Sequence, residues 1–312
     1  KRIRYGIDIT SHIGRQVIID RTYNAITKEY FDGLVIDTFN ALSFNHVNMF
    51  GKKVNLIWDF NKHEYSTNEK KRAKQEIRLN EIQNELRNKL SKWPFLLANT
   101  MNEGQYWPGT GNIRRLLQPT DLKPRPLDGY SIENFAGRSL GPGKKPAYMK
   151  GKAWRDQVKM LMDAAQRGLS ALPFSAAGGS IAGSIRDHFE NYAYASFLMA
   201  VEPDGKIMFG VPVFYYYETA KKYKAWVHPR YYLPIGVPIE TNKPENIDLY
   251  IPKNHVTYVR RFKQGIVLVN SSNENDVILL DDYYFDIDIG KAIKSVNLAS
   301  ATAKILLKMK ND

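Results

Sequence analysis

Along the first two-thirds of the chain, short runs of apolar and β-branched residues alternate with longer stretches in which apolar residues recur at helical spacing. This alternation predicts βα units, the pattern of a parallel sheet covered by helices. The predicted strands are Tyr5–Ile9, Leu34–Thr38, Phe95–Thr100, Gly129–Glu133, Leu169–Phe174 and Lys206–Val211, with Val54–Asp59 as a further candidate. The predicted helices are Arg15–Glu29, Asn68–Lys92, Asn112–Gln118, Trp154–Arg167 and Ser184–Val201.

After residue 218 the pattern changes to short strand-like runs separated by Gly, Asn and Ser turns, which predicts a small antiparallel β domain. Its predicted strands are Thr257–Arg261, Gly265–Val269, Asp276–Leu280, Tyr283–Ile287 and Ala303–Leu307. We therefore expect a (β/α) barrel over residues 1–218, an irregular connector over 219–252 and a C-terminal β domain over 253–312.

The number of strands does not complete a barrel. A (β/α)8 TIM barrel has eight parallel strands, whereas the pattern supplies six, or seven with Val54–Asp59. Either the sheet is open, or a TIM-barrel-like fold lacks its first strands in this chain. Because an unpaired strand edge is a liability, we expect an upstream segment or another chain to cover the strand Tyr5–Ile9.

The composition excludes several kinds of chemistry. The chain of 312 residues has no Cys, which excludes disulfides, thiolate metal sites, iron–sulfur clusters and a Cys nucleophile. The six His residues lack the short spacings of a metal site, no cofactor motif is present, and no apolar run is long enough for a transmembrane segment. We predict neither metal nor cofactor.

The formal net charge of +13 raises the question of an anionic partner. Lys and Arg are scattered and no nucleic-acid-binding motif is present, so the charge favours attraction to a polyanion over sequence-specific nucleic-acid binding. An acidic polysaccharide or a cell envelope would fit, which favours an extracellular or envelope location.

Polar residues stand where several predicted strands end. Asp37 and Glu133 each close a strand that is preceded by Asp-Gly, and Asn99 closes the strand between them. In parallel α/β folds the functional site lies beyond the carboxyl ends of the strands. Two acids and an amide at one such edge suit glycosidic bond hydrolysis, which needs one protonated and one ionised carboxyl group. The alternative is that both acids only cap strand ends.

In the catalytic interpretation Glu133 is the proton donor, and Asp37 is the nucleophile or general base. The remaining polar candidates are assigned to substrate binding: Asp8, Asp59, Asn99 and Asn134.

Three segments resemble a known family. Asp32–Thr38 resembles the fourth-strand motif of the barrels called hypothetical glycosyl hydrolase-like family 15, and more distantly that of endo-α-1,4-polygalactosaminidase-type barrels. Asp128–Phe135 is similar to a later strand of those families. The C-terminal run of His228-Pro229, Leu233–Pro238 and Tyr258–Asn270 is similar to those families as well. Its pattern Arg-x-Phe-x-x-Gly-x-Val-x-Val-Asn, within Tyr258–Asn270, is similar to the entry into their C-terminal β domain. The resemblance implies a glycan-cleaving (β/α)8 barrel whose acidic positions match Asp37 and Glu133.

The segment Gly137–Lys152 follows the Glu133 strand and is rich in Gly, Pro and basic residues. We expect a loop in which Lys144 and Lys145 attract an anionic sugar, with a merely solvated loop as the alternative. Trp107 and Trp154 are candidates for stacking on sugar rings, although aromatic residues near strand ends also pack in cores.

Taken together, the sequence predicts a glycoside hydrolase acting on a polysaccharide, anionic if the lysine loop binds it. The alternative is a non-catalytic structural or carbohydrate-binding component of a larger extracellular or virion assembly, because a fold does not prove chemistry. The run Asn270-Ser271-Ser272 also fits the pattern of an N-glycosylation acceptor.

Overall fold

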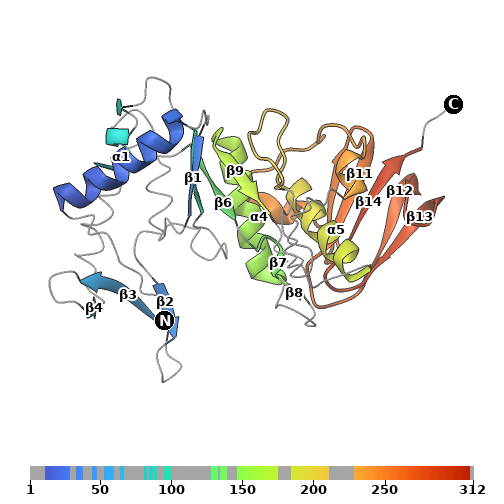
Figure 1. The fold of residues 1–312 in the computed structure, drawn as a ribbon. Coiled ribbons are helices and arrows are strands. Elements are labelled where there is room, and N and C mark those ends of the chain that lie inside the picture. Colours follow the sequence, from blue (N-terminus) through green and yellow to red (C-terminus); the bar gives the residue numbers. More distant parts are fainter. Residues whose placement is uncertain are drawn as a thin grey trace, which may run out of the picture. The chain divides into compact units, whose positions relative to one another are not determined.

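The computed structural model describes fourteen segments of the chain, which together form a mixed α/β architecture with a C-terminal antiparallel sheet (Figure 1). They are residues 11–28, 33–37, 44–47, 53–59, 64–66, 81–82, 84–86, 88–89, 95–99, 128–132, 134–138, 146–174, 184–210 and 228–309. The chain divides into two compact units, Lys1–Thr100 with Gly109–Tyr130, and Met101–Pro108 with Ser131–Asp312.

The first unit contains the helix α1 (His12–Lys28) and the parallel strands β1 (Gly33–Asp37) and β5 (Phe95–Asn99). The helix α1 begins three residues earlier than predicted because Ser11 caps it: the Ser11 hydroxyl accepts a 2.9 Å hydrogen bond from the Gly14 N–H. The predicted strand Tyr5–Ile9 and helix Asn112–Gln118 lie outside the described residues.

The candidate strand Val54–Asp59 forms, but it is antiparallel. It is β3 (Lys53–Asp59), the central strand of a separate sheet between β2 (Phe44–Val47) and β4 (Glu64–Ser66). Its assignment to the parallel sheet is therefore wrong. The apolar period of a single strand does not tell whether its partner is a hairpin neighbour or the strand of a βα unit.

The strand β6 (Gly129–Ile132), whose first two residues belong to the first unit and last two to the second, neighbours β9 (Ser170–Pro173) in one sheet. Isolated parallel bridges join Ala171 to Ile207 and Phe174 to Gly210. A small antiparallel pair, β7 (Gly137–Arg138) and β8 (Ala147–Tyr148), follows β6. The helices are α4 (Gly151–Gln166) and α5 (Ser184–Leu198).

The helix α4 ends as its sequence predicts. Gly168 has the left-handed φ of 62° that a glycine adopts without strain. Its N–H donates to Ala165 O at 3.1 Å, and the Leu169 N–H donates to Ala164 O at 2.9 Å, which together form a Schellman motif. The chain then turns directly into β9.

The predicted C-terminal antiparallel sheet is confirmed. Its strands are β10 (Tyr258–Phe262), β11 (Gly265–Asn270), β12 (Asp276–Asp286), β13 (Lys291–Leu298) and β14 (Thr302–Lys308), in the order β10-β11-β14-β12-β13. Two predicted strands merge into β12, whose register shifts between Leu279 and Tyr284. The strand β13 was missed because this edge strand exposes most of its residues, so its apolar alternation is weak.

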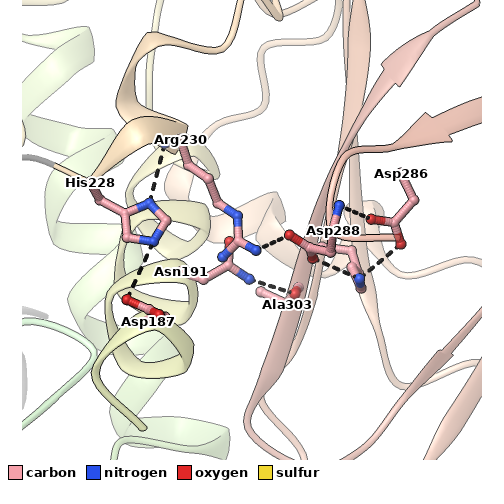
Figure 2. Close-up of polar contacts among 8 residues, drawn as sticks. Asp187, Asn191, His228, Arg230, Asp286, Asp288 and Ala303 are labelled. Carbon is pink, nitrogen blue, oxygen red and sulfur yellow. Dashed lines mark hydrogen bonds and ion pairs between the residues drawn. The ribbon is translucent and has the colours of Figure 1, made fainter. Parts of the chain in front are cut away.

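The connector packs onto both the helical part and the sheet of the second unit. It contains the 3-10 helices η1 (Pro229–Tyr232) and η2 (Pro244–Tyr250). Figure 2 shows Arg230 of this segment reaching Asp288 of the sheet, with which it pairs, and His228 beside Asp187 of α5, 3.9 Å away. Beside them, the Asn191 side chain of α5 donates to Ala303 O at 2.8 Å. Within the described segments, no helix is both long and apolar enough to span a membrane.

Candidate functional site

The carboxyl ends of β1 and β5 place two of the predicted site residues side by side in register. The two strands run parallel from Gly33 opposite Phe95 to Asp37 opposite Asn99. Neighbouring strands lie about 4.8 Å apart, so the backbones of Asp37 and Asn99 are adjacent at the edge where parallel α/β folds bind ligands. For both residues the structure describes the backbone.

The turn that follows β6 has an unusual backbone. Glu133 itself lies outside the described residues, but the next residue, Asn134, has a φ of 59° and Ala136 has a φ of 57°. A residue with a Cβ atom in the left-handed region costs roughly 1 kcal/mol or more, least for Asn. Such conformations persist only where the surrounding structure holds them in place, and they gather at functional sites.

Two groups of hydrogen bonds hold this turn. The Phe174 N–H donates to Ile132 O at 3.0 Å, and the Phe135 N–H donates to Phe174 O at 3.1 Å. From α4, Gln157 accepts a 2.8 Å hydrogen bond from the Ala136 N–H at Oε1 and donates from Nε2 to Asn134 O at 3.5 Å. The backbone is therefore fixed immediately before and after Glu133 in the sequence.

Gln157 was missed in the sequence analysis. The signal that could have found it is its position as a polar residue on an otherwise apolar stripe of the helix. It lies three residues after Trp154, one before Val158 and four before Leu161, and these three residues are fully buried. A buried amide on such a stripe needs hydrogen-bond partners, and here they are backbone groups of the turn after β6.

Trp154, predicted to bind substrate, is instead packed inside the second unit. Its ring is 0% exposed, its Nε1 donates to Ser196 Oγ at 2.7 Å, and its centroid lies 4.6 Å from that of Tyr258. We therefore leave Trp154 out of the proposed site. Asp59 lies opposite Glu64 in the antiparallel β3–β4 pair, outside the β1–β5 pair that carries Asp37. The predicted residues that lie outside the described segments are Asp8, Trp107, Glu133, Lys144 and Lys145.

The most distinctive sequence motif, Tyr258–Asn270, forms the β10–β11 hairpin and joins the sheet to α5. Arg260 is 0% exposed; it donates to Leu198 O, at the end of α5, at 3.0 Å and to Glu240 O from Nε and Nη2. Its guanidinium also lies over the rings of Tyr250 and Phe262, at 5.3 and 5.7 Å from their centroids. The motif thus builds the junction with the β sheet.

Burial sets the electrostatics of this junction. It lowers the pKa of Arg260 and raises the pKa of Glu202, whose Oε1 lies 3.5 Å from Arg260 Nη2. The attraction of Arg260 partly opposes the rise in the pKa of Glu202. These are the shifts of a buried structural pair, remote in sequence from the predicted strand-end acids.

Asn270, the last residue of the motif, uses its amide inside the fold. Nδ2 donates to Glu274 O at 2.7 Å and to Leu298 O at 2.9 Å, while Oδ1 accepts from Ser272 N and Ser272 Oγ. The residue has no exposed surface. Both donor hydrogens are occupied, so the N-glycosylation pattern at Asn270 is explained by a structural turn.

Comparison with known proteins assigns no family. No family model matches the chain, so none supports the resemblance to hypothetical glycosyl hydrolase-like family 15, and no curated protein matches it. Among solved structures, pullulanase from Bacillus acidopullulyticus is similar at a TM-score of 0.42 and 11% sequence identity, over 95% of this chain and 40% of that chain. At this score and identity the similarity assigns neither a family nor an activity, and the chain spans 40% of the length of that protein.

Proposed function

We propose that this chain is a glycoside hydrolase that cleaves a polysaccharide with two carboxyl groups, Glu133 as proton donor and Asp37 as nucleophile or general base. One observation carries the proposal: Asp37 lies in register with Asn99 at the carboxyl ends of two adjacent parallel strands. A lone strand-end cap needs no polar neighbour on the next strand, whereas a sugar ring needs several polar groups on one edge. The strained turn after Glu133 is a second support.

The proposal includes a finer fold and a set of substrate contacts. We propose that the parallel strands belong to a (β/α)8 barrel, in which residues at strand ends converge on one mouth. Asp8, Asn99 and Asn134 would then position the sugar. Trp107 would stack on it, because an aromatic face packs well against sugar C–H groups.

Lys144 and Lys145 would favour an anionic polysaccharide, because positive charge near a cleft raises the local concentration of an anion. Replacing both with Ser is expected to weaken binding of acidic polysaccharides and leave binding of neutral ones unchanged. An equal effect on both kinds, or on neither, would contradict this part of the proposal.

The test of hydrolysis is release of reducing ends from a panel of neutral and acidic polysaccharides. Glu133→Gln and Asp37→Asn are each expected to lower kcat about 100-fold or more, the usual contribution of a positioned acid or base. The control is Asp20→Asn, which removes an exposed acid of the first unit, at 50% side-chain exposure. Binding of a polysaccharide without any cleavage would instead favour the non-catalytic alternative.

The stereochemistry of the product tests the geometry of the pair. Retaining enzymes hold their carboxyl groups about 5 Å apart, and inverting enzymes about 6.5–9.5 Å apart. Proton NMR of the first product released therefore reports the separation of the two carboxyl groups in the working protein.

A further inference from the structure

The turn after β6 assigns a role to Gln157, a residue outside the predicted site that bonds the backbone of this turn. Resting on the function proposed above, we propose that Gln157 is a positioning residue for Glu133: its side-chain amide holds the backbone that follows Glu133 in a conformation which that backbone would not keep alone.

The turn requires an external support because of its own geometry. Asn134 and Ala136 both have positive φ, at 59° and 57°, and neither is a glycine. Ala136 is also fully buried, so its N–H needs a protein partner. A left-handed alanine inside a protein persists when its surroundings fix both its dihedral angles and its hydrogen bonds.

An amide is the group that fits both sides of this turn. Gln157 accepts from the Ala136 N–H at 2.8 Å and donates to Asn134 O at 3.5 Å. A carboxylate could accept the first hydrogen bond but would place an oxygen against the Asn134 carbonyl oxygen. Gln157 is 0% exposed and lies on the rigid helix α4, so its amide is held in position.

Phe174, which directly follows β9, also holds the chain on either side of position 133 in the sequence. Phe174 receives a hydrogen bond from the Phe135 N–H and donates one to Ile132 O. Residue 133 therefore stands in the sequence between two backbone groups that are both bonded to Phe174, the residue after β9. The Gln157 amide adds the constraint that sets the path of the chain immediately afterwards.

The consequence for catalysis concerns the distance between the proposed general acid and the glycosidic oxygen. A general acid works within hydrogen-bond reach of the glycosidic oxygen, and a displacement of about 1 Å can cost about 100-fold in rate. Gln157 would act through the backbone without touching the sugar, so its loss should lower kcat more than it raises KM.

The experiment compares Gln157→Glu with Asn191→Ala, using the polysaccharide that the wild-type chain cleaves best. Gln157→Glu keeps the shape of the side chain and removes its donor. Asn191→Ala removes a different buried amide, one that bonds Ala303 O of the β sheet.

We expect Gln157→Glu to lower kcat about 10- to 100-fold with KM within about threefold, and to shift the alkaline limb of the pH profile of kcat. Asn191→Ala should lower the melting temperature and leave both the pH profile and kcat unchanged.

Hydrogen exchange provides a readout that does not depend on activity. Amide exchange over residues 134–137 should accelerate in Gln157→Glu and stay at the wild-type rate in Asn191→Ala. Unchanged exchange, or a kcat and pH profile equal to those of the wild type in an active protein, would overturn the role of Gln157 alone. A wild-type chain that cleaves no polysaccharide of the panel would overturn the proposed hydrolase and this role together.

Discussion

Arg260 of β10 donates a hydrogen bond of 3.0 Å to the backbone carbonyl of Leu198, where the helix α5 ends. The last carbonyl groups of a helix have no partner within the helix, and here one of them is satisfied by a cation from a strand 62 residues later in the chain. Together with the hydrogen bond from Asn191 of α5 to Ala303 O, this contact ties the C-terminal sheet to the helical part of the second unit.

Replacing Arg260 should therefore destabilise the protein strongly. Arg260→Met would leave the carbonyl groups of Leu198 and Glu240 without these donors and Glu202 without its cation, at a cost of about 3–5 kcal/mol in the free energy of unfolding. Urea denaturation followed by circular dichroism measures the change. The control is Arg261→Met next to it, whose ion pairs are exposed and worth about 1 kcal/mol or less. Equal costs for the two variants would contradict the anchoring role.

Asn270→Asp tests whether the amide of the motif is structural. The substitution removes the Nδ2 donor and brings a carboxylate oxygen against the carbonyl groups of Glu274 and Leu298. We expect a loss of about 3 kcal/mol in the free energy of unfolding. Asn297→Asp, on the exposed side of β13, should stay within about 0.5 kcal/mol of the wild type. If Asn270→Asp unfolds with nearly the same free energy as the wild type, the turn can be closed without the amide.

Gly265→Ala tests the close approach of β11 and β14. A methyl group on Gly265 would lie 2.5 Å from the carbonyl oxygen of Leu306, which belongs to the backbone of the neighbouring strand. Since backbone atoms cannot move aside without breaking the ladder, we expect a loss of roughly 1–3 kcal/mol, measured by thermal unfolding. Ser295→Ala on exposed β13 is the control, and a Gly265→Ala protein as stable as this control would contradict the packing described.

Asp276 should make stability depend on pH in the acid range. Burial opposes ionisation of Asp276, but hydrogen bonds from His255, from the Val256 N–H and from Thr257 outweigh it and lower its pKa to about 2. Because the pKa is lower in the folded chain than the unfolded value of 3.8, the ionised carboxylate stabilises the folded state above about pH 4. That stabilisation is lost as the pH falls toward 2.

Measuring the free energy of unfolding of the wild type and of Asp276→Asn from pH 6 to pH 2 tests this dependence. The difference between the two proteins should be constant at the upper end and shrink below about pH 4. A difference that does not change with pH would show that the interactions of Asp276 do not depend on its charge.

The sequence predicted the elements that have a strong local signal. The period of apolar residues located β1, β5, β6 and β9, and the Gly168 stop located the end of α4. The same logic located the ends of strands and so singled out Asp37 and Asn99, which the register places opposite each other. It failed for β13, since an edge strand can satisfy its exposed face with lysine and serine.

What the sequence by itself determined is the alternation of helix and strand, the presence of a C-terminal antiparallel sheet and the polar residues that end the parallel strands, because each of these shows in the spacing of apolar, polar and turn residues within short stretches of the chain. The tertiary structure alone decided which partner each strand takes, as for β3, and which buried polar groups meet. Gln157 reaches a turn 21 residues before it, and Arg260 reaches a carbonyl 62 residues before it. No local pattern encodes such pairs, since their free energy comes from satisfying buried polar groups that only the folded chain brings together.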